Sequence, residues 1–145
     1  MGICAGFNNI CRAIGIDTQD IYNLSSVHNI FSKKMQHSVS LPAGTFLEEL
    51  LEKEELLVNS IHTQFLELSA ILSDEEDDNE RKIEICAIAE DNIAGYNYIT
   101  IEAFLVKDTN FALAIKWHPE LIDDDKNKIF GYFSDKCKEY FHQKK

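Results

Sequence analysis

The chain has 145 residues, of which 45% are apolar and 27% are charged, with 6 glycines and 2 prolines. This composition excludes collagen-like, low-complexity and disordered classes, and the length suits one domain with an ordinary core. The net charge of -11 repels phosphate backbones and anionic lipid, so neither nucleic acid nor a membrane is an expected partner. Because the chain shows neither a membrane-length apolar run nor a signal peptide, we expect a cytoplasmic protein.

The cysteines are scattered along the chain as Cys4, Cys11, Cys86 and Cys137. Their spacing forms no C-x-x-C pair and stands beside no histidine cluster, so it indicates neither a zinc site nor a disulfide framework. We therefore expect reduced thiols, each of which is by default a small buried hydrophobe.

The first half of the chain predicts short elements. Apolar residues at steps of three and four predict a helix that begins after Cys4 and ends at Gly15. Residues 17–38 are polar and mixed, which indicates a surface loop, and strands are expected over 38–41 and 57–60. Thr45 and Glu48 have the spacing of a capping box, so a short helix is predicted over 46–51.

The second half predicts a sheet followed by a helix. The acidic run 74–80 reads as a solvated loop, because its spacing does not match a calcium-binding loop. Strands are expected over 82–89, 98–106 and 111–117, arranged as an antiparallel meander. A final amphipathic helix over 123–142 is expected to close the domain with one apolar face made of Ile129, Phe130, Phe133, Cys137, Tyr140 and Phe141.

The segment from Gly2 to Gly6 reads G-x-C-x-G, the thiol version of the nucleophile elbow, in which a strand turns sharply into a helix. The two glycines leave room around Cys4, and the N-terminus of the following helix favours a thiolate there. The alternative is an ordinary tight turn beside a buried cysteine, and the pattern alone does not separate the two.

The second candidate is Trp117-His118-Pro119-Glu120, at the end of an expected strand. Proline biases His118 toward extended backbone, in which residues two apart share a face, so Glu120 can reach the imidazole. A carboxylate there orients the ring and stabilises its cation while the other nitrogen faces a thiol. The alternative is a structural histidine near a strand end.

Taken together, these motifs resemble the class I glutamine amidotransferase superfamily, whose triad is Cys, His and Glu in this chain order. The segment 58–64 (VNSIHTQ) is similar to the V-N-S-x-H-x-Q stretch of the gamma-glutamyl-gamma-aminobutyrate hydrolase branch. Ile101-Glu102-Ala103, the block 114–120 and the pair Ile129-Phe130 with Phe133 also resemble segments of that branch. The resemblance extends over nearly the whole of 1–145, read as a single, partial amidotransferase domain.

The resemblance implies an α/β, flavodoxin-like fold and cleavage of the side-chain amide of glutamine or a gamma-glutamyl amine. It implies that Cys4 forms a gamma-glutamyl thioester, that His118 shuttles the proton and that Glu120 holds His118. The backbone N–H of Ala5 would be one oxyanion donor. The residues that would line the substrate pocket are Asn8, Ser60 and His62. For Ser60 and His62 an equal alternative is a structural role, in which they make ordinary capping hydrogen bonds in a turn at the end of a strand. Thiol, imidazole and carboxylate suffice, so no metal or organic cofactor is implied.

The sequence also departs from the family pattern. Only three residues precede Cys4, so we expect the fold to lack its N-terminal strands and helices, including the loop that donates the second oxyanion N–H, and to expose an open sheet edge. Ala5 and Asn8 replace the Arg and Gln that are usual in the elbow, and Lys116 replaces a Gln. The shorter Asn8 side chain is expected to leave polar groups unpaired.

Three hypotheses follow. The first is an active amidase that hydrolyses a gamma-glutamyl amide or transfers its ammonia, favoured by the intact Cys4, His118 and Glu120. The second is a remnant without turnover, favoured by Ala5, Asn8 and the missing strand. The third is a subunit that completes its sheet with another chain, either a second copy or an ammonia-using synthase, and serves as a non-catalytic binding module or as a glutaminase module.

Overall fold

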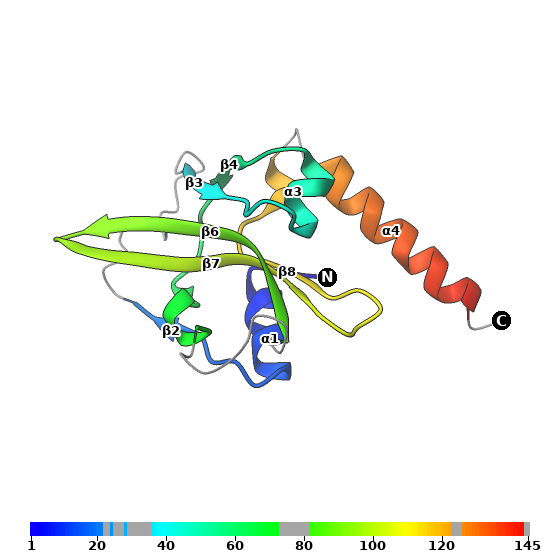
Figure 1. Ribbon diagram of the computed structural model, residues 1–145, viewed down its shortest axis with the longest axis horizontal. Helices are drawn as coiled ribbons and strands as arrows, with labels where there is room; N and C mark the ends of the chain where they lie inside the picture. Colours follow the sequence, from blue (N-terminus) through cyan, green and yellow to red (C-terminus); the bar gives the residue numbers. More distant parts are fainter. Residues whose placement is uncertain (22–23, 25–27, 29–35, 73–81, 123–125, 144–145) are drawn as a thin grey trace.

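The computed structural model describes residues 1–21, 24, 28, 36–72, 82–122 and 126–143 (Figure 1). The strands are β1 (Gly2–Ile3), β2 (Gln19–Asp20), β3 (Gln36–Ser40), β4 (Glu55–Asn59), β5 (Gln64–Phe65), β6 (Ile83–Ile93), β7 (Tyr96–Val106) and β8 (Leu113–Ile115). The helices are α1 (Ala5–Ala13), α3 (Phe46–Leu51) and α4 (Lys126–Gln143), with 3-10 turns at Leu68–Ala70 and Pro119–Leu121. None of the helices within these ranges is long and apolar enough to cross a membrane.

A mixed sheet of six strands, in the order β1-β8-β7-β6-β3-β4, forms the centre of the molecule. β6, β7 and β8 are antiparallel neighbours, which confirms the expected meander. β1 occupies one edge and pairs in parallel with β8, with Gly2 opposite Ala114 and Ile3 opposite Ile115. The carboxyl ends of β1 and β8 therefore lie side by side, and this juxtaposition positions the site described below.

The hairpin of β6 and β7 is longer than the sequence predicts. Its strands are joined by Ala94 and Gly95, which both have positive φ, 54° and 83°. Two consecutive left-handed residues make the tight turn that suits a twisted hairpin. The pairing therefore continues to Ile93 opposite Tyr96, through a polar stretch that lies outside the predicted strands.

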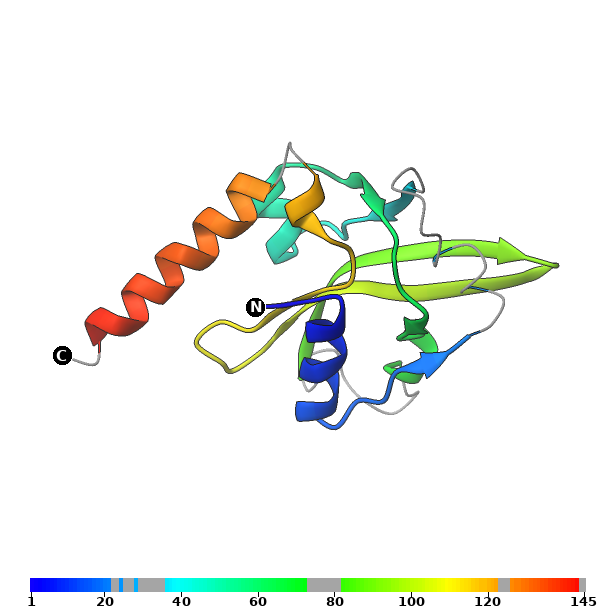
Figure 2. The same ribbon diagram turned by 180° about the vertical axis from the view of Figure 1, so that it is seen from behind.

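The sheet is covered on both faces. In Figures 1 and 2, α1 lies on one side of the sheet and α3 lies on the other. Phe7 and Cys11 of α1 pack with Phe104, and the rings of Phe7 and Phe104 meet edge to face at 5.0 Å. Leu47 and Leu51 of α3 belong to the second core cluster. The predicted helices after Cys4 and over 46–51 are both present.

Two expectations for the first half need correction. The range 17–38 is not a loop throughout, because it contains β2, which pairs with β5, and the start of β3. The predicted capping box is only partly formed. The Glu48 carboxylate accepts from the N–H of Gly44 at 3.1 Å, but the Thr45 hydroxyl donates to the Pro42 carbonyl, and Glu84 accepts the N–H of Phe46 instead. The acidic run 74–80 lies outside the described residues.

The apolar face of α4 closes the domain only at the start of the helix. Ile129 is buried, whereas Tyr140 and Phe141 are 37% and 68% exposed. Figure 1 shows the reason, because α4 runs outward beyond the sheet toward the C-terminus. The expectation that Tyr140 and Phe141 pack into the core is therefore wrong.

Candidate active site

Cys4 sits on a strained turn between β1 and α1. Its φ is 50° and its ψ is -101°, outside the regions that a residue with a side chain normally occupies. Its N–H donates to the carbonyl of Ile115 at 2.9 Å, which ties the turn to β8. This is the strand-turn-helix geometry that the G-x-C-x-G pattern predicts, and it presents a side chain at the tip of the turn.

The surroundings of the Cys4 thiol are partly polar. The side chain is partly exposed, and Sγ lies 3.8 Å from the carbonyl oxygen of Ile61. Ala5 is the first residue of α1, so its N–H has no acceptor within the helix. A backbone donor therefore stands next to the thiol at the positive end of a helix dipole.

His118 and Glu120 contact each other directly. The Nδ1 atom of His118 lies 2.6 Å from Oε1 of Glu120. The predicted extended segment is replaced after His118 by the 3-10 turn at Pro119–Leu121, yet the pair still forms. Asn59 fixes the backbone of His118, because its side chain accepts the His118 N–H and donates to the His118 carbonyl, both at 2.8 Å. The sequence carries no sign of these two hydrogen bonds from Asn59.

The topology brings the two motifs to one edge of the sheet. Cys4 follows β1, and the His118 segment follows β8, the parallel neighbour of β1. Ile61, whose carbonyl oxygen lies near the thiol, comes two residues after Asn59, the last residue of β4. Elements that are far apart in the chain thus supply a thiol, a backbone donor and an imidazole–carboxylate pair at the same edge.

Asn8 has partners at both ends of its amide, so the expectation of unpaired polar groups is wrong. Its Nδ2 donates to Gln64 at 2.6 Å, and its Oδ1 accepts from Nζ of Lys116 at 2.7 Å. The Lys116 ammonium also lies 4.9 Å from the centre of the Phe7 ring, in cation–π contact. Asn8 and Lys116, which both depart from the family pattern, are therefore hydrogen-bonded to each other.

Lys116 is an unusual residue for this place, because its side chain is 1% exposed. Burial lowers the pKa of its ammonium, while the charges of Glu102 and Cys4 act in the opposite direction.

Ser60 and His62 lie behind the thiol in a buried polar cluster. The Ser60 hydroxyl donates to the carbonyl of His28 and also contacts Nδ1 of His28, both at 2.8 Å. His62 packs against Phe65, and its Nε2 lies 3.7 Å from the Glu102 carboxylate. Burial lowers the pKa of His62, so its neutral imidazole is favoured. Both side chains are engaged with the protein interior and hold the residue between them, Ile61, beside Cys4.

Glu102 is the buried carboxylate of this cluster, and the sequence predicts no role for it. Its side chain is 1% exposed. Burial by itself raises the pKa of Glu102, but contacts with His37 and His62 outweigh it and hold the pKa well below its usual range. His28 and His37 belong to no motif, so only the three-dimensional structure reveals them.

The other described cysteines differ from Cys4 in their environment. Cys11 and Cys86 are fully buried, and burial raises the pKa of Cys11 to about 11 and that of Cys86 to about 12. Both are therefore neutral thiols at physiological pH and poor nucleophiles. Cys137 lies partly exposed on α4.

Comparison with known proteins adds two findings. The family model described as Peptidase C26 matches residues 1–120. The crystal structure of a Thermoplasma acidophilum protein described as part of a GMP synthase is similar, with a TM-score of 0.63 and 20% sequence identity. That match covers 99% of this chain and 60% of the other, and it confirms the α/β fold predicted from the sequence. No curated protein matches the chain.

Proposed function

Because the chain belongs to the peptidase C26 family, which is class I glutamine amidotransferase-like, we propose that it cleaves the side-chain amide of glutamine or of a gamma-glutamyl amine. The observations that carry the proposal are the strained Cys4 turn at the end of β1 and the His118–Glu120 pair, which follows β8, the parallel neighbour of β1. A thiol nucleophile and an imidazole held by a carboxylate are the groups that nucleophilic amide hydrolysis uses. The proposal treats residues 1–145 as one amidotransferase-type domain.

The proposed reaction has two steps. The Cys4 thiolate attacks the side-chain carbonyl carbon, and the oxyanion receives the N–H of Ala5. His118, held by Glu120, carries the thiol proton to the leaving amine, so the C–N bond breaks and a gamma-glutamyl thioester forms. Water, deprotonated by His118, then attacks the thioester and releases glutamate and the free thiol.

We assign the remaining predicted residues supporting roles in this reaction. Asn8 contributes to the floor of the substrate pocket, where Lys116 and Gln64 fix its amide. Ser60 and His62 hold the Ile61 carbonyl near the thiol, as their buried contacts indicate. The V-N-S-x-H-x-Q stretch resembles the gamma-glutamyl-gamma-aminobutyrate hydrolase branch. The first substrate to test is therefore gamma-glutamyl-gamma-aminobutyrate.

The proposal predicts thiol-dependent turnover. Purified chain incubated with glutamine or gamma-glutamyl-gamma-aminobutyrate should release glutamate, and Cys4→Ala should abolish the release because no nucleophile remains. Cys137→Ala is the matched control and should keep the wild-type rate, since this thiol lies on α4. Release of glutamate can be followed with a coupled dehydrogenase assay. Equal rates in wild type and Cys4→Ala, or no release by a chain shown to be folded by circular dichroism, would contradict the proposal.

A second function is binding to another chain, either a copy of itself or an ammonia-using synthase. The specific observation is the groove of about 340 Å³ beside α4, lined in part by Phe111, Tyr140 and Phe141. Exposed aromatic side chains of this kind mark interaction surfaces. The similar solved protein is described as a subunit of a synthase, and this chain spans 60% of it. Sedimentation velocity of the purified chain separates a monomer from such an assembly.

A further inference from the structure

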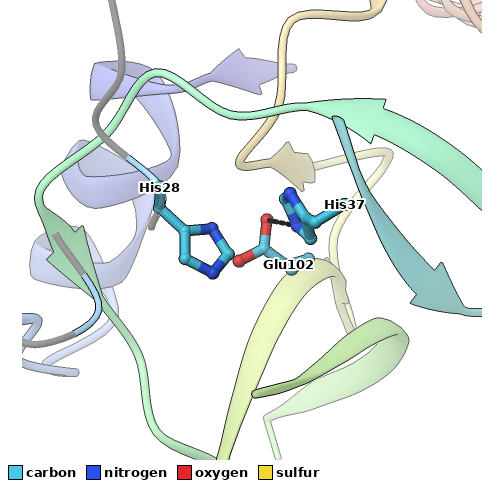
Figure 3. Close-up of side chains that lie close together, drawn as sticks. All are labelled: His28, His37 and Glu102. Atoms are coloured by element: carbon cyan, nitrogen blue, oxygen red, sulfur yellow. Dashed lines mark ion pairs between the residues drawn. The ribbon is translucent and has the colours of Figure 1, made fainter. Parts of the chain in front are cut away.

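A cluster of buried metal-ligating side chains lies behind the candidate active site. One ligand atom each from His28, His37 and Glu102 lies within 4.8 Å of the others. The side chains of His28 and Glu102 are 0% and 1% exposed, and that of His37 is 13% exposed. His37 comes from β3 and Glu102 from β7, and Figure 3 shows the two imidazoles on either side of the Glu102 carboxylate.

These side chains are poorly satisfied by the rest of the described protein. Within the described ranges, neither ring nitrogen of His37 has a hydrogen-bond partner, and neither does Oε2 of Glu102. Buried polar atoms without partners destabilise a fold, and native proteins show few of them. Their presence together at one point indicates that a further group satisfies them.

The distances suit a bridging ion better than direct hydrogen bonds. Nε2 of His37 lies 3.6 Å from Oε2 of Glu102, too far for a good hydrogen bond. Two ligand atoms that bind one tetrahedral Zn²⁺ at 2.0–2.1 Å lie about 3.4 Å apart. This pair therefore needs to change by only a few tenths of an ångström to hold an ion, and the three ligand atoms, which lie within 4.8 Å of one another, must draw together around it.

His28 has the second partner that metal-ligating histidines usually have. Its Nε2 lies 2.9 Å from the Asp91 carboxylate, which accepts the Nε2–H and leaves a lone pair on Nδ1. With Nε2 protonated, the single Ser60 hydroxyl proton is shared between Nδ1 and the carbonyl of His28, both at 2.8 Å; if Nδ1 binds a metal, the hydroxyl moves off Nδ1 and keeps the carbonyl as its acceptor. A carboxylate behind a ligating imidazole fixes its tautomer and orientation.

We propose that His28, His37 and Glu102 bind a divalent transition-metal ion, with Zn²⁺ as the preferred occupant. Two imidazoles and one carboxylate are a donor set that suits Zn²⁺ and disfavours Mg²⁺ and Ca²⁺. The Nε2 atom of His62 lies 3.7 Å from the same Glu102 oxygen, so this imidazole is the nearest candidate for a fourth ligand. The ligands come from β3 (His37), β7 (Glu102) and His28, which lies between β2 and β3 in sequence, and the site does not depend on the proposed amidase activity.

The proposal predicts one zinc ion per chain. Chain stripped with a chelator should take up one equivalent of Zn²⁺ in competition with a chromophoric chelator, and should take up no Mg²⁺. His37→Gln should weaken the Zn²⁺ affinity by at least about 100-fold, and Asp91→Asn by about 10–100-fold, as loss of an orienting partner does. His142→Gln, at the exposed end of α4, is the matched control and should bind as the wild type does.

Measurements on the unaltered chain remain informative if His37→Gln does not fold. Co²⁺ added to the stripped wild type should give the intense visible absorption of a four-coordinate site, and Zn²⁺ should raise the melting temperature. Weak absorption typical of six-coordinate Co²⁺, no change in melting temperature, or Zn²⁺ binding of equal strength in wild type and His37→Gln would each overturn the proposal.

Discussion

Replacing His118 by Gln should lower kcat/KM for gamma-glutamyl amide hydrolysis by about 10²–10⁴-fold, the range that a positioned proton-transfer group supplies. The reason is that His118 alone among the proposed triad can carry the proton between thiol and leaving amine. Glu120→Gln should also lower the rate, because an amide 2.6 Å from Nδ1 cannot stabilise the imidazolium as a carboxylate does. The measurement is steady-state kinetics on gamma-glutamyl-gamma-aminobutyrate.

A matched control separates this effect from the loss of surface charge. Glu52 is an exposed carboxylate that pairs with Lys128 at 3.0 Å, far from the turn in sequence. Glu52→Gln should therefore leave kcat/KM unchanged. Wild-type kinetics in His118→Gln would remove His118 from the mechanism, and equal losses in Glu52→Gln and Glu120→Gln would attribute the effect to fold stability.

Gly2→Ala should be the most damaging small substitution in the elbow. A Cβ at Gly2 would lie 2.5 Å from the carbonyl oxygen of Gly6 and 2.8 Å from the Ile10 side chain. The first contact is with backbone, which cannot yield without moving α1 away from β1. Overpacking typically costs about 1–3 kcal/mol, and we expect the upper end of this range or more. Urea denaturation followed by circular dichroism measures the loss.

Gly6→Ala provides the control for this prediction. A Cβ at Gly6 meets nothing within 4 Å, and the residue lies inside α1, where alanine is a better helix former by up to about 1 kcal/mol. The two glycines of one motif should thus respond with opposite signs. Equal unfolding midpoints for Gly2→Ala and the wild type would show that α1 does not pack on β1 as described.

Local signals in the sequence were sufficient for the elbow, the meander and the His118–Glu120 contact. Each depends on residues near in the chain: glycines around Cys4, alternation in the strands, and the two-residue spacing of His118 and Glu120, whose contact forms through a 3-10 turn and not through the predicted extended backbone. The hairpin turn at Ala94 and Gly95 was missed because a polar stretch hid the continued pairing.

The features that the sequence could not reveal all depend on distant contacts. The ammonium of Lys116 meets Asn8 only because β8 carries it beneath α1. His28, His37 and Glu102 share no motif, and the prediction that no metal is needed considered only the cysteines, the acidic run 74–80 and the triad. The amphipathic pattern of α4 likewise does not show that the helix extends beyond the sheet, where none of the described strands remains for its last turns to pack on.

The most direct test of the proposed nucleophile is mass spectrometry after reaction with a diazo-ketone analogue of glutamine. We predict stoichiometric labelling at Cys4 and none in Cys4→Ala, while Cys11 and Cys86, whose pKa values are raised to about 11 and about 12, stay unlabelled. No adduct, or equal labelling of Cys4, Cys11, Cys86 and Cys137, would contradict the account and favour a chain that keeps the triad residues without their chemistry.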